Sequence, residues 1–367
     1  MSPAGAAGGL HSGAANFRRD FYRELMASKD VGVQAVEGLF RDLMIDQQWA
    51  IRRPRGFTWW AYRLAQHVEV APPTSDGVHE VCEVRVWTDV ANKIDPTRHP
   101  ATVVGVANMQ QTLNALVWDP VERSVTECCK VVVTEENIGW LGKVLTWAAV
   151  LQNTAAHSRA HGVANVLGGV LAASNHPRSG ERPSMDDILN VPTSLIAPAG
   201  KKKSAFAGPF TEALGPFAVQ FGLLGFADAH GFTCEVPFTG SRPAAMLVGE
   251  PPETALVKVF ANAPHPAFGN GALLTMSLPP DFDKERVPAI ANQLNLAESK
   301  VGTDTMFLGA WCSDPTSNKQ RSLAFCAFIP NVLAQPGLLE NMVIYQARRS
   351  RFVASVLGPG GELTAHT

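Results

Sequence analysis

The chain has 367 residues, of which 46% are hydrophobic and only 17% are charged. This composition excludes a disordered chain, and the 31 glycines and 26 prolines are too dispersed for a collagen-like or low-complexity protein. A formal net charge of −2 supplies no bulk field that would attract nucleic acid or an anionic membrane. The low charge fits a protein that covers part of its surface with a partner or with another copy of itself.

Cysteine usage and hydropathy indicate a cellular compartment. The six cysteines are scattered without a C-x-x-C pair, so the sequence suggests neither a disulfide framework nor a zinc ribbon. Residues 1–15 lack the basic start and the continuous apolar stretch of a signal peptide. The most apolar segment, 215–226, is too short to span a bilayer and is interrupted by Gln220. These features predict a cytoplasmic protein with reduced thiols.

Apolar periodicity predicts a series of helices and strands in chain order. In the first part of the chain the expected elements are a helix over 33–49, strands over 60–70 and 82–86, a helix over 100–114, a hairpin of 115–118 with 125–133, and a long helix over 137–171. In the second part they are a helix over 215–229, strands over 232–237, 256–260 and 273–278, a helix over 283–298, a hairpin of 305–311 with 322–329, and a helix over 331–356.

The same order of elements and landmarks occurs twice, which indicates an internal repeat. The landmarks are a Gly-Phe-Thr run, an Ala-Asn pair, an Asp-Pro turn and an asparagine that opens a helix. They stand at 56–58, 107–108, 119–120 and 137, and again at 231–233, 291–292, 314–315 and 331. We therefore expect an α+β protein with two tandem α-β-β-α-β-β-α repeats, whose antiparallel sheets are flanked by helices and packed as a pseudo-dimer.

This organisation divides the chain into five parts. The expected parts are a flexible tail (1–30), a first repeat (31–173), a linker (174–205), a second repeat (206–358) and a C-terminal tail (359–367). The linker is rich in proline and carries three consecutive lysines, which is typical of a segment that packs on the surface rather than of a further domain.

Motifs for catalysis and for metal or cofactor binding are missing. The sequence has neither a P-loop nor a G-x-S-x-G elbow. His157 and His161 lie four apart on the predicted long helix, a spacing that a zinc site can use, but the glutamate of an H-E-x-x-H motif and a third ligand are missing. The sequence therefore predicts no catalytic residue, no metal site and no cofactor.

Two groups of residues are candidates for binding. His176, Arg178 and Arg182 gather in the linker, where the guanidinium groups either recognise a carboxylate or phosphate or pair with neighbouring acidic residues. Trp59 and Trp60 are neighbours on a predicted strand, so their side chains point to opposite faces, and Trp87 lies opposite the apolar stripe of its own strand. Either a helix or the other repeat covers that second face, or these three tryptophans contact a partner.

The order of elements resembles the fold of type III secretion chaperones and the related YbjN-like proteins. Their unit is a helix, a few antiparallel strands, a helix, a strand pair and a final helix. The likeness is clearest in the second copy, in Ala291-Asn292, the strand to Trp311, the strand 323–328, and Ile329-Pro330-Asn331 before the last helix. The resemblance implies binding without catalysis, because such domains hold protein or peptide clients on the sheet and in helix-lined grooves, commonly as dimers.

Two functions of different classes follow. The first is a non-catalytic, chaperone-like or adaptor protein of the bacterial cytoplasm that binds a protein or peptide client, with self-association left open and with neither nucleic acid nor membrane as a partner. The rival is an enzyme or sensor that binds a small anionic ligand through His176, Arg178 and Arg182. A scaffold or immunity-system component would have the same fold as the first.

Overall fold

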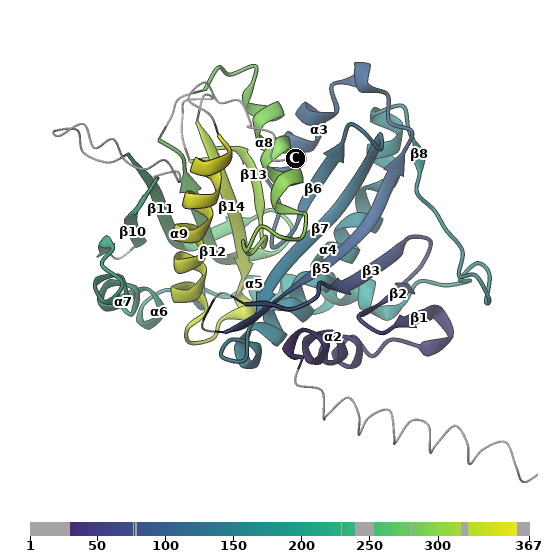
Figure 1. Ribbon diagram of the computed structural model, residues 1–367, viewed down its shortest axis with the longest axis horizontal. Coiled ribbons are helices and arrows are strands. Elements are labelled where there is room, and N and C mark those ends of the chain that lie inside the picture. Colours follow the sequence, from purple (N-terminus) through teal and green to yellow (C-terminus); the bar gives the residue numbers. More distant parts are fainter. Residues whose placement is uncertain are drawn as a thin grey trace, which may run out of the picture.

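The computed structural model describes residues 30–357, apart from 76, 78, 229, 239–252, 280–281 and 317–321. Both predicted tails fall outside this range, except for Asp30 at the start of the first helix. Helices and two antiparallel sheets make up the fold (Figure 1), which confirms the predicted α+β class. Among the described helices, none combines the length and the apolar character needed to cross a membrane.

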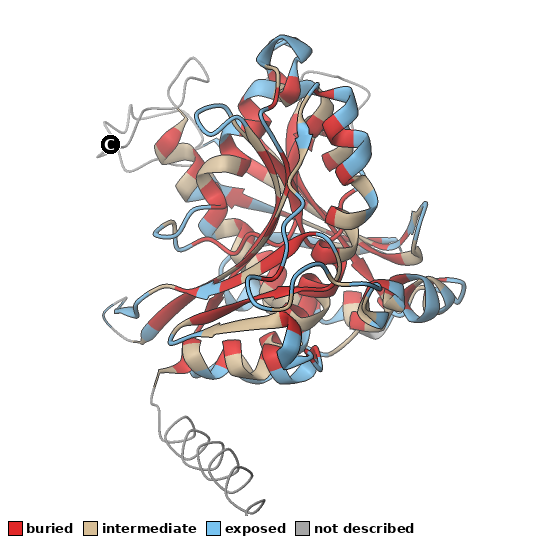
Figure 2. Cartoon of the chain, turned by 90° about the vertical axis from the view of Figure 1, so that its right-hand side faces the viewer, coloured by how far each residue is buried: buried red, intermediate tan, exposed pale blue. Residues whose placement is uncertain are grey.

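The first sheet belongs to the first half of the chain, residues 30–173. Its strands follow the order β1-β2-β3-β5-β7-β6, and the short strands β4 and β8 pair with β5. The strands are β1 (Ala50–Arg53), β2 (Gly56–Trp60), β3 (Ala65–Val70), β4 (Thr74–Ser75), β5 (Glu80–Asn92), β6 (Ala115–Asp119), β7 (Ser124–Val133) and β8 (Val170–Leu171). The helices of this half are α2 (Val31–Asp42), α3 (Pro100–Asn108) and α4 (Ile138–Val166). Helices α2 and α4 cover one face of the sheet (Figures 1 and 2).

The second sheet belongs to the second half, residues 206–357. Across the sheet, its strands follow the order β9-β10-β11-β12-β14-β13. They are β9 (Leu224–Asp228), β10 (Gly231–Pro237), β11 (Thr254–His265), β12 (Gly269–Ser277), β13 (Ala310–Ser313) and β14 (Leu323–Pro330). The main helices of this half are α7 (Leu214–Gln220), α8 (Val287–Glu298) and α9 (Leu338–Val356). The short helices α5 (Ala197–Gly200) and α6 (Pro209–Glu212) lead into it.

The two sheets share one strand order. In each, four antiparallel strands are followed by a helix, by an edge strand, and by a strand that inserts between that edge and the fourth strand. The strands β4 and β8 are additions of the first half. The predicted repeat had two strands before its middle helix, whereas each sheet has four strands in its path there, so the predicted element order is corrected. A duplication of the sequence itself stays a prediction.

Several predicted helices are shorter than expected. The helix expected over 33–49 ends at Asp42, and a turn and a 3-10 helix (Gln47–Trp49) precede β1. The helix expected over 137–171 ends at Val166, and β8 takes its last residues. The helix expected over 215–229 ends at Gln220, and β9 follows as the edge strand of the second sheet. A continuous apolar run does not distinguish a helix from a strand by its period. In β9, the ladder with β10 decides the conformation.

Asparagine side chains complete the backbone hydrogen bonds of the edge strands where the two halves meet. The N–H of Trp118 in β6 donates to Asn292 Oδ1 of α8 at 2.9 Å, and Asn292 Nδ2 donates to the Trp118 carbonyl at 2.9 Å. Asn108 bonds Leu116 of β6 in the same two-way fashion. An exposed edge strand invites pairing with other chains, so these amides close the edge of β6.

A buried ion pair joins the first sheet to the second half. Lys130 Nζ on β7 lies 3.2 Å from Glu83 Oε1 on β5, and the side chains are 0% and 5% exposed. Lys130 also donates to the Lys300 carbonyl at 2.8 Å and to Thr303 Oγ1. Glu83 accepts from the N–H of Gly302 at 2.6 Å. The pair therefore holds the turn 300–304 of the second half against the first sheet.

This turn also aligns the two sheets. It leads to Phe307, whose backbone forms two hydrogen bonds with that of Lys130, with N···O distances of 3.0 and 2.8 Å. The largest buried apolar cluster contains residues of both sheets and of α2, α4, α8 and α9. The two halves therefore share one core.

We expect Lys130→Met to lower the free energy of unfolding by about 3–5 kcal/mol, because it leaves the Glu83 carboxylate buried without its countercharge. Urea denaturation followed by tryptophan fluorescence measures the loss. Lys143→Met is the control, since Lys143 is exposed on α4 and its replacement should change the free energy by less than about 0.5 kcal/mol. A Lys130→Met protein as stable as the parent would contradict the role of the pair.

Candidate functional site

The three candidate tryptophans occupy different environments. Trp59 is 1% exposed, and its Nε1 donates to Gln66 Oε1 at 2.6 Å in the core beneath α4. Trp60 is 6% exposed, and its Nε1 donates to Ser174 Oγ at 3.0 Å. The expectation that these two contact a partner is therefore corrected, because their rings are buried and their N–H groups are already bonded.

Trp87 is the partly accessible member of the three. It lies on the face of the first sheet opposite α2 and α4, where its ring stacks on that of His67 with centroids 5.0 Å apart. The Arg85 guanidinium lies 4.7 Å from the Trp87 ring centroid. Burial lowers the pKa of His67, so this imidazole is neutral at pH 7. His67 and Arg85 therefore both contact the indole ring, and Trp87, which is half-buried, also lines a cavity of about 220 Å³.

The linker residues do not converge on a common ligand position. The His176 ring is buried against Trp60, with centroids 5.0 Å apart, and its Nδ1 accepts from the N–H of Ser179 at 2.9 Å. Arg182 donates to the Trp60 carbonyl at 2.6 Å and pairs with Asp186 at 2.8 Å. Arg178 is exposed. Arg182 thus pairs with a neighbouring acidic residue rather than lying free for an anionic ligand, which was one of the two alternatives from the sequence. Its hydrogen bond to Trp60 holds the linker on the first half.

The two histidines of α4, His157 and His161, lie in different environments. His157 Nδ1 lies 2.9 Å from the Asn153 carbonyl, and the N–H of Leu64 approaches His157 Nε2 at 3.4 Å. Burial lowers the pKa of His157, which keeps its imidazole neutral. His161 is exposed. The first histidine therefore serves the packing of α4 against the first sheet.

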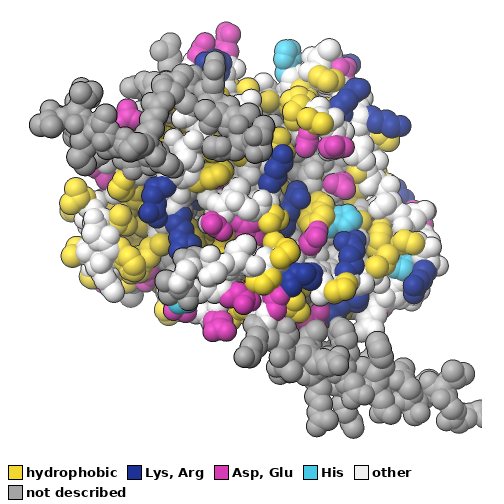
Figure 3. Space-filling view, viewed as in Figure 1, with side chains coloured by type: hydrophobic (Ala, Val, Ile, Leu, Met, Phe, Trp, Pro, Cys, Tyr) yellow, Lys and Arg dark blue, Asp and Glu magenta, His cyan; other side chains and the backbone are white. Residues whose placement is uncertain are grey.

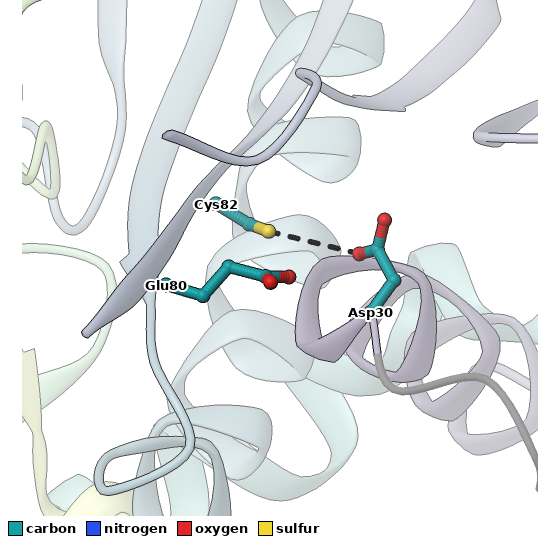
Figure 4. Close-up of side chains that lie close together, drawn as sticks. All are labelled: Asp30, Glu80 and Cys82. Carbon is teal, nitrogen blue, oxygen red and sulfur yellow. Dashed lines mark hydrogen bonds between the residues drawn. The ribbon is translucent and has the colours of Figure 1, made fainter. Parts of the chain in front are cut away.

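Three groups of metal-ligating type lie together where α2 begins beside β5 (Figure 4). They are Asp30, Glu80 and Cys82, which the sequence analysis did not single out. The Asp30 carboxylate caps α2 by accepting from the N–H of Val33 at 3.0 Å, and it pairs with Arg55. Burial raises the pKa of the Cys82 thiol to about 11, and the thiol donates to Asp30 Oδ1 at 3.6 Å. Asp30 thus acts as the cap of α2 and as the ion-pair partner of Arg55.

A groove of about 800 Å³ lies between α2 and α4. Small residues open it, namely Gly38 on α2 with Gly139 and Gly142 on α4. Its floor is apolar where Trp147 lines it, and charged side chains of both signs stand at its rim. Met44, which is 85% exposed, lies at one end.

A cluster of exposed apolar side chains lies at the outer edge of the second sheet. We call Val219, Phe221, Leu224 and Phe226 the β9 patch; their exposed fractions are 75%, 52%, 78% and 69%. Hydrophobic side chains gather in this region, at the left of Figure 3. Strand β9 pairs with β10 along one side, and no described strand pairs with its other side.

Local geometry turns the patch outward. A side chain at Gly225 would meet the Phe232 ring at 2.7 Å and Ala218 of α7 at 3.1 Å, and Ala227 is the next residue on the same face, so this face of β9 carries only small residues. Leu224 and Phe226 stand on the opposite face, because side chains alternate along a strand. The apolar residues of 215–229 predict a helix, whereas the structure has a helix only to Gln220 and an exposed strand at Leu224–Asp228.

Comparison of the chain with protein-family models, with curated proteins and with solved structures finds no significant match. The resemblance to secretion chaperones, which rests on the order of elements and on short landmarks, stays a prediction.

The two linker arginines should differ in their effect on stability. We expect Arg182→Ala to lower the free energy of unfolding by about 1.5–3 kcal/mol, because it removes hydrogen bonds from a charged donor to Trp60 and Asp186. Arg178→Ala, at an exposed position, should change it by less than about 0.5 kcal/mol. Thermal unfolding of both variants checks the difference, and equal effects would argue against the anchoring role of Arg182.

Proposed function

We propose that the protein is a non-catalytic binding protein of the bacterial cytoplasm that takes up an extended segment of a protein client along β9. The observation that carries the proposal is the β9 patch on a strand edge without a described partner. Main-chain groups of such an edge can form a ladder with an incoming strand, while its side chains select the partner.

The other edge strands of the two sheets, β1, β6 and β13, are protected in ways that β9 is not. Asn292 and Asn108 close the edge of β6, and Asn295 bonds the backbone of Trp311 in β13 at 2.8 and 2.9 Å. Strand β1 ends in two arginines, and charge on an edge strand opposes pairing with other chains. Strand β9 carries its one charged residue, Asp228, at its end.

The side chains of β9 indicate the chemistry of the client. Leu224 and Phe226 project from the same face two residues apart, and Val219 and Phe221 are exposed in and just after α7, which packs on the other face of β9. A matching strand would present apolar side chains at every second position. The client is thus an extended segment with alternating apolar residues, a kind of occupant that also agrees with binding on the sheet in the chaperones that the sequence resembles.

Site-specific photo-crosslinking tests this site. A photoreactive phenylalanine analogue replaces Phe226 in the full-length protein inside the producing cell, and the same analogue at Met44, beside the α2–α4 groove, is the matched control. We expect a discrete crosslinked polypeptide from position 226 and none from position 44. Crosslinks confined to position 44 would contradict binding at β9 and indicate the α2–α4 groove as the client site. Crosslinks from position 226 to a second copy of the chain would contradict client binding and indicate self-association.

Affinity measurements complete the test. We expect Phe226→Asp to weaken binding of a synthetic peptide of the crosslinked segment by about tenfold or more, because burying a phenylalanine side chain contributes about 1.5–3 kcal/mol. The thermal stability of the variant should match that of the parent, since Phe226 is 69% exposed. Unchanged affinity for the peptide would contradict the proposal.

A further inference from the structure

Three consecutive lysines stand on the segment that leads from α5 to α6. Lys201, Lys202 and Lys203, which we call the lysine loop, are all exposed. Among the described residues, none of the three side chains forms an ion pair. Neighbouring like charges repel one another, and only 17% of the residues of this chain are charged. A negatively charged partner would offset this local concentration of positive charge.

Side-chain amides hold the backbone of the lysine loop in one conformation. Asn331 Nδ2 donates to the Lys203 carbonyl at 3.1 Å, and Asn331 Oδ1 accepts from the N–H of Ala205 at 2.9 Å. Asn270 Nδ2 donates to the Lys202 carbonyl at 2.8 Å. All of these bonds engage backbone groups of the loop, so they leave its ammonium groups available. A fixed backbone reduces the conformational entropy that is lost when a partner binds.

The lysine loop lies at the end of the second sheet at which β9 ends. Ser204, which follows the loop, donates through its hydroxyl to the Ala261 carbonyl of β11. The N–H of Ala261 donates in turn to the carbonyl of His230, which lies between β9 and β10, at 3.0 Å. Helices α5 and α6, on either side of the loop, lie at the lower end of this sheet in Figure 1. The loop and the end of β9 at Asp228 are therefore close neighbours.

A strand added to β9 would bring its own flanking residues within reach of the lysine loop. The loop adjoins β11, and β10 lies between β11 and β9. Neighbouring strands are about 4.8 Å apart, so an added strand would lie about 15 Å from β11. An extended chain advances about 3.3 Å per residue, so roughly four to five residues beyond the paired segment cover this distance.

We propose that the lysine loop is a second contact for the client and binds acidic residues next to the client's apolar β9-binding segment. This inference rests on the proposed binding along β9. Opposite charges at the rim of an interface raise the rate of association and disfavour partners of the wrong charge. A nucleic acid or an anionic membrane fits less well, because such partners are bound by larger basic clusters than three lysines in a chain of net charge −2.

Photo-crosslinking from the lysine loop tests this contact in the full-length protein inside the producing cell. The photoreactive phenylalanine analogue replaces Lys202, and the same analogue at Lys284, an exposed lysine beyond the other end of β12, is the matched control. We expect position 202 to crosslink the same polypeptide as position 226, at a site rich in aspartate and glutamate within about ten residues of the site reached from 226. We expect no crosslink from position 284.

The crosslinking outcomes separate this contact from the proposed function. A client crosslinked from position 226 but not from position 202 would overturn the lysine-loop contact and leave binding along β9 in place. A different polypeptide or a nucleic acid crosslinked from position 202 would overturn it as well. Absence of a client crosslink from position 226 would instead overturn the proposed function, and this inference with it.

Affinity measurements decide whether the contact is electrostatic. One variant combines Lys201→Gln, Lys202→Gln and Lys203→Gln, and its control combines Lys143→Gln, Lys284→Gln and Lys300→Gln at other exposed positions. At about 50 mM NaCl we expect the first variant to bind a synthetic peptide of the crosslinked segment with its acidic flank about fivefold or more weakly than the parent, and the control to stay within about twofold. The difference should shrink at about 500 mM NaCl, because salt screens exposed charges. Equal affinity of the first variant and the parent at the lower salt concentration would overturn the inference.

Discussion

The Lys130–Glu83 ion pair is the contact on which the arrangement of the two halves depends. Both residues belong to the first sheet, yet the turn 300–304 of the second half supplies their further hydrogen bonds. Removing two charges from water is costly, so such a pair persists only where extra bonds complete it. The same turn leads to Phe307, whose backbone pairs with Lys130, and then to β13. The position of β13 beside the first sheet follows from burying this pair.

That arrangement decides which strand edges face solvent. The edges of β6 and β13 lie where the halves meet, and the amides of Asn108, Asn292 and Asn295 complete their backbone hydrogen bonds. The edge of β9 lies on the opposite side of the second sheet, far from this joint, and is apolar. Backbone N–H and C=O groups at a strand edge need hydrogen-bond partners. Asparagine side chains supply them where the two halves meet, and we propose that a client strand supplies them at β9.

The candidate residues show where reasoning from the sequence stops. Period two correctly puts Trp59 and Trp60 on opposite faces, because both lie on the extended strand β2. Which face is covered depends on Ser174, which is 114 positions away and binds Trp60 when the linker folds back. The linker arginines likewise reveal their roles only through their partners, since Arg182 reaches the Trp60 carbonyl 122 positions earlier.

The sequence by itself determined the α+β class, the hairpins around the two Asp-Pro turns and the long helix α4, because these depend on turn residues and on periodicity within about ten to thirty neighbouring residues. Only the tertiary structure decided that 224–228 is an exposed strand and that asparagine side chains complete the backbone hydrogen bonds of β6 and β13. Exposure and hydrogen-bond satisfaction are properties of the contacts between distant segments. No local pattern of residue types specifies them.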